Sequence, residues 1–357
     1  MINVQRDVSL APLTTIGLGG KARLFVSCRT LDQLCEALQL AADQSLRIHV
    51  LGGGSNVIFS DDGFSGLVIR LEMKGLSFAD EGNAVTVSAA AGESWDEFVQ
   101  ECLARDLAGI ECLSGIPGLV GATPIQNVGA YGQEVCNTIV EVQAVERETR
   151  EIVKFSNDDC CFGYRQSIFK SGDAGNYVVT GVTFRLQKHG EPIIHYPELQ
   201  KFLVALPVWQ ALPAGERKLR GVREAVLALR KRKSMVLDSG DPHSRSVGSF
   251  FMNPVLTEEQ FNTVCARWRS SGGTDQVPSY PGIKGIKIPA AWLVEKAGFK
   301  KGYRSGGVGV SLNHSLALVN YGGSTQGLLD LATRIQKAVS DRFGIELERE
   351  PVVVPFE

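Results

Sequence analysis

A stretch of nineteen residues, Ser114–Gly132, constrains this chain more than any other part of its sequence. It holds five glycines and two prolines, so neither a regular helix nor a regular strand can run through it. Most other residues in it are apolar, and the amide side chains of Gln126 and Asn127 can donate hydrogen bonds. Long loops inside compact domains are usually functional. We therefore predict that this segment wraps a flat, polar ligand, and the alternative is a long structural loop.

A second glycine-rich motif, Gly52–Asn56, follows the apolar segment Ile48–Leu51, which we predict to be a buried strand. Backbone N–H groups in such a turn can converge on an anion, because glycines let the chain turn tightly against a phosphate. A glycine-rich connection between two strands explains the motif equally well. A dinucleotide-binding fingerprint does not, because the G-x-G-x-x-G spacing and the helix that should follow it are missing.

Apolar periodicity predicts helices and strands in mixed order. Helices are expected at 31–42, 95–103, 219–229, 257 onwards and 324–343. Strands are expected at 48–51, 67–71, 85–87, 140–144, 177–186 and in the tail after residue 344. Two helix starts have the pattern of a capping box, Ser94 with Glu97 and Thr257 with Gln260. Segment 197–215 contains several prolines and is predicted to be a linker or an insertion.

The composition excludes several classes of protein. At 357 residues the chain should form two or three domains. Lys and Arg total 37 against 39 Asp and Glu, so a general affinity for nucleic acid or anionic membranes is not expected. The eight cysteines include no C-x-x-C pair, and the sequence offers no metal-ligand spacing and no Ser-His-Asp arrangement. With neither a signal peptide nor an apolar run of about 20 residues, a cytoplasmic protein is expected.

Four motifs, which follow one another along nearly the whole chain, together resemble the UDP-N-acetylenolpyruvoylglucosamine reductases. They are GGGSN at 52–56, GIPGLVGATPIQNVGAYG at 115–132, GYRQSIFK at 163–170 and GSFFMNP at 248–254. The resemblance implies an α+β chain with an FAD-binding fold of the vanillyl-alcohol-oxidase type in two subdomains, plus a smaller α+β substrate-binding domain. The implied boundaries are 1–72 and 73–195 for the two FAD-binding subdomains, 206–345 for the substrate-binding domain, and 346–357 for a C-terminal tail that returns to the active site.

The resemblance also implies a reaction and three catalytic residues. In that family a hydride passes from NADPH to FAD and then from flavin N5 to C3 of UDP-N-acetylglucosamine enolpyruvate. C2 receives a proton, and the product, UDP-N-acetylmuramate, is a peptidoglycan precursor. The implied proton donor is Ser249, although an unperturbed serine is a poor acid and needs a positive, pre-organised surrounding. Arg165 would bind the substrate carboxylate and stabilise the enolate-like charge. Glu350 would orient the same intermediate, and Glu348 is the alternative because both lie on one face of a strand.

Further residues are implied as ligand contacts. Those expected to contact FAD are Gly52, Gly53, Gly54, Ser55, Asn56, Ser114, Gly115, Ile116, Pro117, Gly118, Gly121, Ala122, Pro124, Gln126, Asn127, Gly129, Ala130, Tyr131 and Gly132. Those expected to contact the substrate are Tyr164, Tyr196, Lys233, Asn253 and His314. Tyr196 resembles the tyrosine loop of one branch of the family, which closes on the nucleotide phosphates, although a proline stands here where that loop has a glycine. Lys233 would bind the diphosphate.

Several of these roles have a simpler alternative. The alternative for Ser249 is a turn hydroxyl, and for Arg165 a surface charge. Lys233 could equally complement a helix C-terminus, and a lone histidine such as His314 is often structural. We expect a monomer that requires no metal. The sequence decides neither between NADPH and NADH nor whether Tyr196 moves.

Two other functions stay open. One is an FAD-dependent oxidase of a sugar acid or lactone on the same fold. Such oxidases often attach FAD through a histidine near the glycine motif that corresponds to Gly52–Asn56, whereas His49 lies before that motif inside a predicted strand. The other is a nucleotide-sugar sensor without catalysis, which would not need Arg165, Ser249 and Glu350 together.

Overall fold

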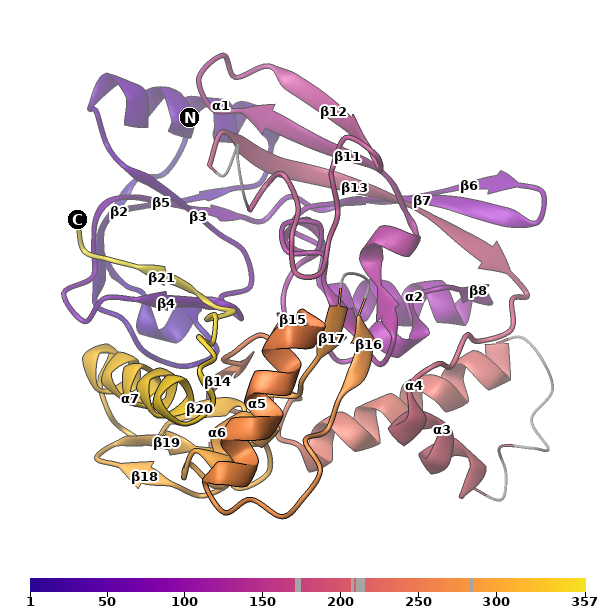
Figure 1. Cartoon of the computed structure of the whole chain (residues 1–357). Helices are drawn as coiled ribbons and strands as arrows, with labels where there is room; N and C mark the ends of the chain where they lie inside the picture. The colour runs from indigo at the N-terminus through magenta and orange to yellow at the C-terminus, as the bar shows by residue number, and fades with distance from the viewer. Residues whose placement is uncertain (171–174, 207–208, 210–215, 283–284) are drawn as a thin grey trace. The chain divides into compact units, whose positions relative to one another are not determined.

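The structure, a computed structural model, describes residues 1–170, 175–206, 209, 216–282 and 285–357 (Figure 1). The chain forms two compact units, and each combines segments that are far apart in the sequence. The first unit consists of Met1–Val8, Ala22–Gly53 and Ser65–Val236, and the second of Ser9–Lys21, Gly54–Phe64 and Leu237–Glu357. The domain boundaries expected from the sequence stay a prediction.

A four-stranded sheet with one helix lies mostly in the first unit. Its order is β1-β2-β5-β3, in which β3 and β5 run parallel. Its strands are Gln5–Ser9 (β1), Lys21–Cys28 (β2), Ile48–Leu51 (β3) and Phe64–Leu71 (β5). Helix α1 (Leu31–Asp43) begins after Thr30, whose hydroxyl accepts a hydrogen bond from the Gln33 N–H. The helix and the strand at 48–51 were both predicted, and both are confirmed.

A larger antiparallel sheet forms the rest of the core of the first unit. Its order is β12-β11-β13-β7-β6, and β8 also pairs with β13. The strands are Leu76–Glu81 (β6), Ala84–Ala90 (β7), Leu107–Ala108 (β8), Ile139–Glu146 (β11), Ile152–Ser156 (β12) and Tyr177–Lys188 (β13). Helix α2 (Trp95–Ala104) packs on it through aromatic rings. The Phe98 ring centroid lies 4.9 Å from that of Phe184 on β13 and 5.6 Å from that of Trp95.

The start of α2 differs from the sequence expectation, because Ser94 and Glu97 do not form a capping box. The Ser94 side chain makes no capping hydrogen bond. Instead, the Trp95 N–H donates to the Gly118 carbonyl at 3.1 Å, and Ser94 forms a β-bridge with Leu119. Backbone of the long glycine-rich segment Ser114–Gly132 therefore takes the place of a side-chain cap. A local sequence pattern cannot indicate such a long-range replacement.

Part of the expected linker is helical, so that expectation is corrected. Pro197–Val204 forms α3, which starts with a proline where a helix N–H has no partner anyway. Glu216–Arg232 forms α4, as the sequence predicted. The two helices share a buried apolar cluster, made of Cys112, Leu199, Leu203, Val222, Ala225, Val226 and Leu229. The prolines at 207 and 213 and the glycine at 215 lie outside the described residues.

The second unit contains a four-stranded sheet, a three-stranded sheet and a group of helices. A four-stranded sheet, ordered β14-β20-β19-β18, consists of Ser246–Ser249, Ala317–Asn320, Val308–Val310 and Arg304–Ser305. A three-stranded sheet, ordered β15-β17-β16, consists of Val255–Leu256, Gly285–Lys287 and Tyr280–Gly282. The helices are Glu258–Ser270 (α5), Ala290–Lys296 (α6) and Thr325–Phe343 (α7), and Figure 1 shows α5 and α6 beside α7. The capping box of Thr257 and Gln260 and the long C-terminal helix are both confirmed.

Short N-terminal segments complete the second unit. Strand β4 (Val57–Phe59) pairs in parallel with β21 (Val352–Val354), so the tail is a strand as expected. Close to β4, the Asp61 carboxylate accepts hydrogen bonds from the N–H groups of Thr325 and Gln326 at 2.8 and 2.9 Å. A carboxylate at this end of a helix satisfies N–H groups without a partner and interacts favourably with the helix dipole. The N-terminal segment therefore caps α7 across a sequence separation of 264 residues.

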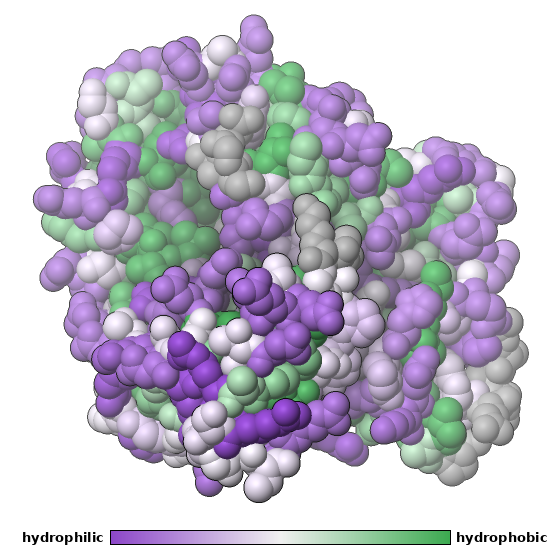
Figure 2. Space-filling view, viewed as in Figure 1, coloured by the Kyte–Doolittle hydropathy of each residue, from purple (hydrophilic) through white to green (hydrophobic). Residues whose placement is uncertain are grey.

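The surface agrees with the balanced composition of the chain. On the face drawn in Figure 2, hydrophilic side chains are spread across the surface, and hydrophobic ones form smaller groups between them. Among the described residues, no helix is long and apolar enough to cross a membrane.

We expect Asp61→Ala to lower the free energy of unfolding by about 1 kcal/mol, because two N–H groups of α7 lose their acceptor. Urea unfolding followed by circular dichroism measures the change. Asp62→Ala is the matched control, since Asp62 is the next residue and is also exposed, while the first α7 N–H groups bond to Asp61 and Ser324. Equal losses in the two variants would contradict the capping role.

Candidate active site

The two glycine-rich segments contact each other within the first unit. Gly52 and Gly53 follow β3, and a Cβ placed on Gly53 would lie 2.7 Å from the Gly118 Cα. No larger residue fits this approach, so Gly53 is needed for close packing of the two backbones. A Cβ on Gly52 would lie 3.7 Å from the Ala122 Cβ. The short motif is therefore part of the same local structure as the long loop.

The remaining part of the short motif belongs to the second unit. Gly54 has a φ of +66°, and a Cβ there would clash with the Leu13 carbonyl. The Asn56 side chain donates to the Glu350 carbonyl at 3.3 Å, and the Val352 N–H donates to the Asn56 carbonyl at 3.0 Å. Asn56 therefore holds the C-terminal tail beside β4.

A buried carboxylate closes the base of the long loop. Glu111 is fully buried, and its carboxylate accepts hydrogen bonds from the Gly109 N–H and the Gln133 side chain, both at 2.7 Å. The Gln133 side chain also accepts from the Cys112 N–H at 2.8 Å. Because Glu111 precedes the loop and Gln133 follows it, this pair joins the two ends of the loop. Neither residue lies in a sequence motif, so the sequence did not indicate this pair.

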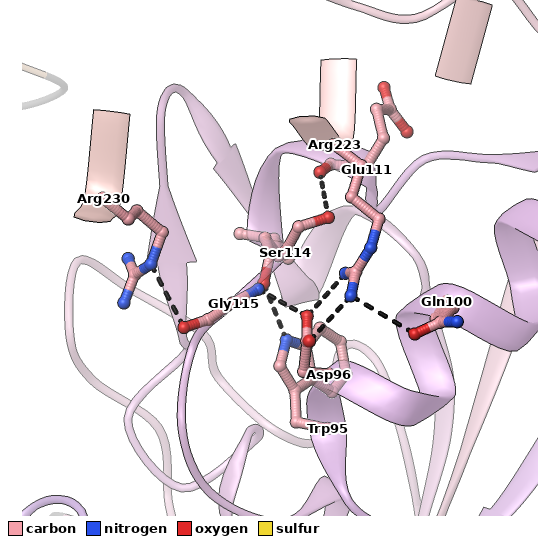
Figure 3. Close-up of polar contacts among 9 residues, drawn as sticks. Trp95, Asp96, Gln100, Glu111, Ser114, Gly115, Arg223 and Arg230 are labelled. Carbon is pink, nitrogen blue, oxygen red and sulfur yellow. Dashed lines mark hydrogen bonds and ion pairs between the residues drawn. The ribbon is translucent and has the colours of Figure 1, made fainter. Parts of the chain in front are cut away.

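Helices α2 and α4 anchor the start of the loop (Figure 3). The guanidinium of Arg223 on α4 forks onto the carboxylate of Asp96 on α2, with N–O distances of 2.6 and 2.7 Å. The same carboxylate accepts from the Gly115 N–H at 2.5 Å. On the other side, the Arg230 Nε–H donates to the Gly115 carbonyl at 3.2 Å. Both backbone polar groups of Gly115 are thus bonded to side chains that no sequence motif indicated.

The Asp96 carboxylate is charged at neutral pH. Burial is the largest single influence and would raise its pKa, but the hydrogen bonds from Arg223 and Gly115 outweigh burial and hold the pKa below the ordinary value. A carboxyl group with a lowered folded-state pKa stabilises the fold above its unfolded pKa and loses that contribution as the pH falls through the folded value. The anchor should therefore weaken only in acid.

The third motif lies against the middle of the loop. The Arg165 guanidinium donates to the Asn127 carbonyl at 3.2 Å and to the Gly129 carbonyl at 2.7 Å. In return, the Asn127 side chain donates to the Gly163 carbonyl at 3.0 Å. The Arg165 guanidinium carbon also lies 5.5 Å from the centroid of the Tyr164 ring. The structure therefore joins Arg165 and Tyr164 to the loop expected to bind FAD.

Three residues of this region have left-handed backbone conformations. Asn127, Tyr131 and Arg165 have φ angles of +45°, +50° and +56°. Each such angle costs a non-glycine residue about 1 kcal/mol or more, and strain of this kind clusters at functional sites. The Asn127 side chain helps to fix the loop, because its amide donates to Glu134 at 2.9 Å and its oxygen accepts from the Cys136 N–H at 3.1 Å. Contact between Asn127 and a ligand stays a prediction.

The residues expected to contact FAD fall into two groups by their solvent exposure. Buried ones are Gly54, Ser114, Gly115, Gly121, Pro124 and Asn127. Partly or fully exposed ones are Gly52, Gly53, Ser55, Asn56, Ile116, Pro117, Gly118, Ala122, Gln126, Gly129, Ala130, Tyr131 and Gly132. Ser114 directs its hydroxyl to the Glu111 carbonyl at 2.7 Å, so this side chain supports the loop from inside.

Tyr131, Tyr196 and Lys233 meet at the end of the loop. The two tyrosine rings pack edge to face, with centroids 5.4 Å apart. The Lys233 ammonium lies 5.8 Å from the Tyr131 ring centroid and 2.6 Å from the Glu198 carboxylate. Burial raises the pKa of the Tyr131 hydroxyl to about 12. The structure therefore groups two expected substrate residues with one expected FAD residue.

In the second unit, Ser249 ends β14 between two other segments. On one side it pairs with Ala317 of β20, and its hydroxyl oxygen lies 3.4 Å from the His314 Nε2. On the other side, the Glu350 N–H donates to the Phe250 carbonyl at 2.9 Å. The structure therefore brings Ser249, His314 and Glu350 to neighbouring segments, although they are far apart in the sequence.

Burial distinguishes the two candidate glutamates of the tail. Glu350 is half-buried, whereas Glu348 is exposed. Asn253, an expected substrate residue, accepts a hydrogen bond from the Ala290 N–H at 2.8 Å, at the first residue of α6. That contact supports the fold, and a contact of Asn253 with substrate stays a prediction.

The expected catalytic residues are divided between the two units. Arg165 belongs to the first, and Ser249 and Glu350 belong to the second. That they act on one substrate stays a prediction. In the described part of the chain, no group of three or more His, Cys, Asp or Glu residues could hold a metal ion.

Comparison with known proteins gives matches over nearly the whole chain. Residues 22–156 match the model of an FAD binding domain, and residues 241–354 match that of the UDP-N-acetylenolpyruvoylglucosamine reductase C-terminal domain. The UDP-N-acetylenolpyruvoylglucosamine reductase of Thermobifida fusca is 44% identical over 356 residues, which cover 98% of this chain and 97% of the relative. That of Streptomyces avermitilis is 44% identical over 365 residues, covering 100% and 97%. The crystal structure of the Thermus caldophilus reductase matches with a TM-score of 0.67 at 24% identity, covering 99% of this chain and 100% of that one.

We expect Asp96→Asn to weaken FAD binding about tenfold, or about 1.4 kcal/mol, because Arg223 and Gly115 lose their charged acceptor. Fluorescence titration of the apoprotein with FAD measures the Kd. Asp80→Asn is the control, because Asp80 also pairs with a cation, Lys188, but on an exposed strand. Unchanged FAD affinity in Asp96→Asn would show that this anchor does not position the loop.

Proposed function

This chain belongs to the UDP-N-acetylenolpyruvoylglucosamine reductase family, and from that membership we propose that it reduces UDP-N-acetylglucosamine enolpyruvate to UDP-N-acetylmuramate with NADPH as reductant. It is a UDP-N-acetylmuramate dehydrogenase, a flavoprotein of peptidoglycan precursor synthesis. The observation that carries this conclusion is the 44% identity to such reductases over almost the full length of both chains. We expect it to act in the cytoplasm as a monomer.

The two glycine-rich segments are suited to hold FAD. Their contact at Gly53 and Gly118 requires backbone without side chains, and such backbone can also approach a flat ligand or a phosphate closely. The anchors at Asp96 and Glu111 give the loop a defined shape before any ligand arrives. FAD held by these segments would supply hydride-transfer chemistry, with a hydride accepted from NADPH and one passed on from flavin N5 to C3 of the enolpyruvyl group.

Ser249 is the group that we expect to protonate C2. It ends a strand whose neighbours fix it from both sides, so its hydroxyl has a defined position. A positioned proton donor typically accelerates such a step by about 10²- to 10⁴-fold. Its proton would go to C2 as the hydride reaches C3.

Arg165 is the group that we expect to stabilise the negative charge on the substrate carboxylate. A guanidinium can fork onto a carboxylate through two parallel N–H bonds. The carbonyls of Asn127 and Gly129 orient this guanidinium, so little reorganisation is needed when charge develops. Glu350, which is half-buried beside the Ser249 strand, would orient the same intermediate.

Tyr196 and Lys233 support assignment to the branch of the family with a tyrosine loop. Tyr196 packs against Tyr131 immediately before α3, and Lys233 lies beside the same ring. A tyrosine hydroxyl and an ammonium at one place are suited to a diphosphate. We propose that both contact the substrate diphosphate, and that Tyr164 and Asn253 contact other parts of the nucleotide sugar.

A single-turnover experiment tests the function and the role of Ser249 together. The purified protein is reduced with NADPH under anaerobic conditions, and UDP-N-acetylglucosamine enolpyruvate is then added while the flavin absorbance is followed. We expect this substrate to restore the oxidised spectrum. We expect Ser249→Ala to be reduced by NADPH normally and to reoxidise at least about 10²-fold more slowly.

The outcomes separate the competing functions. A reduced flavin that does not respond to the enolpyruvyl substrate and is reoxidised only when oxygen is admitted would indicate an oxidase, and no reduction by NADPH would indicate a sensor. Parent-like reoxidation of Ser249→Ala would overturn only the assignment of the proton donor. Ser246→Ala serves as control, because Ser246 lies on the same strand and is buried.

Glu350→Gln and Glu348→Gln form a matched pair that tests the tail. We expect Glu350→Gln to lower kcat by about 10²-fold with the flavin still bound, because the lost charge acts on the reacting part of the substrate. We expect Glu348→Gln to stay within about threefold of the parent, since its side chain is exposed. Steady-state kinetics with both substrates measure the two effects, and the reverse ranking would assign the role to Glu348.

A further inference from the structure

Ser249 contacts a histidine that the family resemblance implied only as a substrate contact. The Ser249 Oγ lies 3.4 Å from the His314 Nε2. The backbone fixes this approach, because the Phe250 N–H donates to the Leu316 carbonyl at 2.8 Å and the Ala317 N–H donates to the His314 carbonyl at 3.1 Å. A tight turn before β20 therefore holds the imidazole beside the end of β14.

We propose that His314 is the positioning residue and proton source of Ser249, to which it returns a proton after each protonation of the substrate. The proposal rests on the proposed role of Ser249 as proton donor. It assigns His314 to the serine rather than to direct recognition of the nucleotide.

A serine needs help to act as a proton donor. A serine hydroxyl is a poor acid because its alkoxide is unstable in the absence of a nearby proton or positive charge. A protonated imidazole supplies both, since its Nε2–H can donate to the Ser249 oxygen while the hydroxyl proton points at the substrate. The positive charge of the imidazole stabilises the developing Ser249 alkoxide and so lowers the barrier to proton transfer from its hydroxyl.

The protons balance in two steps. First, the Ser249 O–H bond breaks and a C–H bond forms at C2, while the hydride reaches C3 of the same substrate. Second, the His314 Nε2–H bond breaks and the Ser249 O–H bond forms again. The neutral imidazole then takes one proton from water before the next turnover. Each turnover thus consumes one solvent proton and one hydride, as the reduction of a carbon–carbon double bond requires.

Charged groups of both signs belong to the segments that neighbour His314 and Ser249. The carboxylate of Glu295 on α6 bonds to the hydroxyl of Ser315, the residue after His314. Glu350 belongs to the tail segment that pairs beside Ser249. Of the nearby cations, the Arg349 guanidinium is bonded to residues of α7, and Arg245 is exposed ahead of β14. Carboxylates near a histidine favour its protonated form.

His314→Gln is the decisive variant, because an amide can keep a hydrogen bond to Ser249 but cannot donate a titrating proton. Anaerobic reoxidation by the enolpyruvyl substrate is measured from about pH 5.5 to about 9, a range that brackets the ordinary histidine pKa of about 6.5. In the parent, the rate should fall as the imidazole loses its proton. In His314→Gln, it should be about 10- to 100-fold lower at the acid end and nearly independent of pH.

Reduction by NADPH and the KM for the enolpyruvyl substrate should stay within about threefold of the parent in His314→Gln, because the residue acts through Ser249. A parent-like pH profile would overturn the proposal. So would a raised KM with unchanged kcat, which would identify His314 as a substrate contact. His189→Gln is the matched control, since His189 is 81% exposed in its side chain and pairs with Asp106 in the first unit. It should change neither quantity.

A second measurement does not depend on turnover. The His314 ring is titrated by NMR in the FAD-bound parent and in Ser249→Ala, with its signal assigned by its loss in His314→Gln. We expect its pKa to differ between the two proteins, because the ring loses its hydroxyl partner. An identical titration would overturn the contact even if His314→Gln folded poorly. Parent-like reoxidation in Ser249→Ala would instead refute the proposed donor itself, so the two failures can be told apart.

Discussion

Buried backbone N–H and C=O groups need hydrogen-bond partners, and a loop whose only regular elements are a 3-10 turn at Val120–Ala122 and a two-residue strand at Gly129–Ala130 must find most of them outside a regular ladder. The long glycine-rich loop depends on this constraint. Its base is closed by Glu111 and Gln133, and both polar groups of Gly115 are bonded to side chains. Its middle is held by the mutual contacts of Asn127 and Arg165 with the facing backbone. The same hydrogen bonds that stabilise the loop therefore position the guanidinium that we expect to act in catalysis.

A second constraint joins the two ends of the chain. Parallel pairing of β4 with β21 and capping of α7 by Asp61 make N-terminal segments part of the second unit. Asn56 adds a hydrogen bond to the Glu350 carbonyl. The short glycine motif therefore has two tasks, since Gly53 packs on the long loop and Asn56 holds the tail. The sequence left two interpretations of this motif open, an anion site and a connection between strands. Neither interpretation included the hydrogen bonds between Asn56 and the tail.

Predictions from local pattern succeeded where local physics decides the structure. The apolar faces of α1, α4 and α7 follow from helical spacing. The capping box follows from a contact between Thr257 and Gln260, which are three positions apart. Prediction failed where a distant segment supplied the partner. At Ser94 the backbone of Gly118 replaced the side-chain cap, and at Pro197 burial of apolar residues against α4 favoured a helix over a linker.

The sequence by itself determined the class of the protein, because glycine motifs, apolar periodicity and the order of four motifs are local properties that can be read along the chain. It also named Arg165, Ser249 and Glu350 through resemblance. Only the tertiary structure decided which side chains support them. Asp96 pairs with Arg223 and Ser249 contacts His314, although the residues of each pair are far apart in the sequence. Contacts of this kind produce no recognisable spacing of residues in the sequence. Their choice depends on how helices and strands pack, because a hydrogen bond is decided by distance in space rather than along the chain.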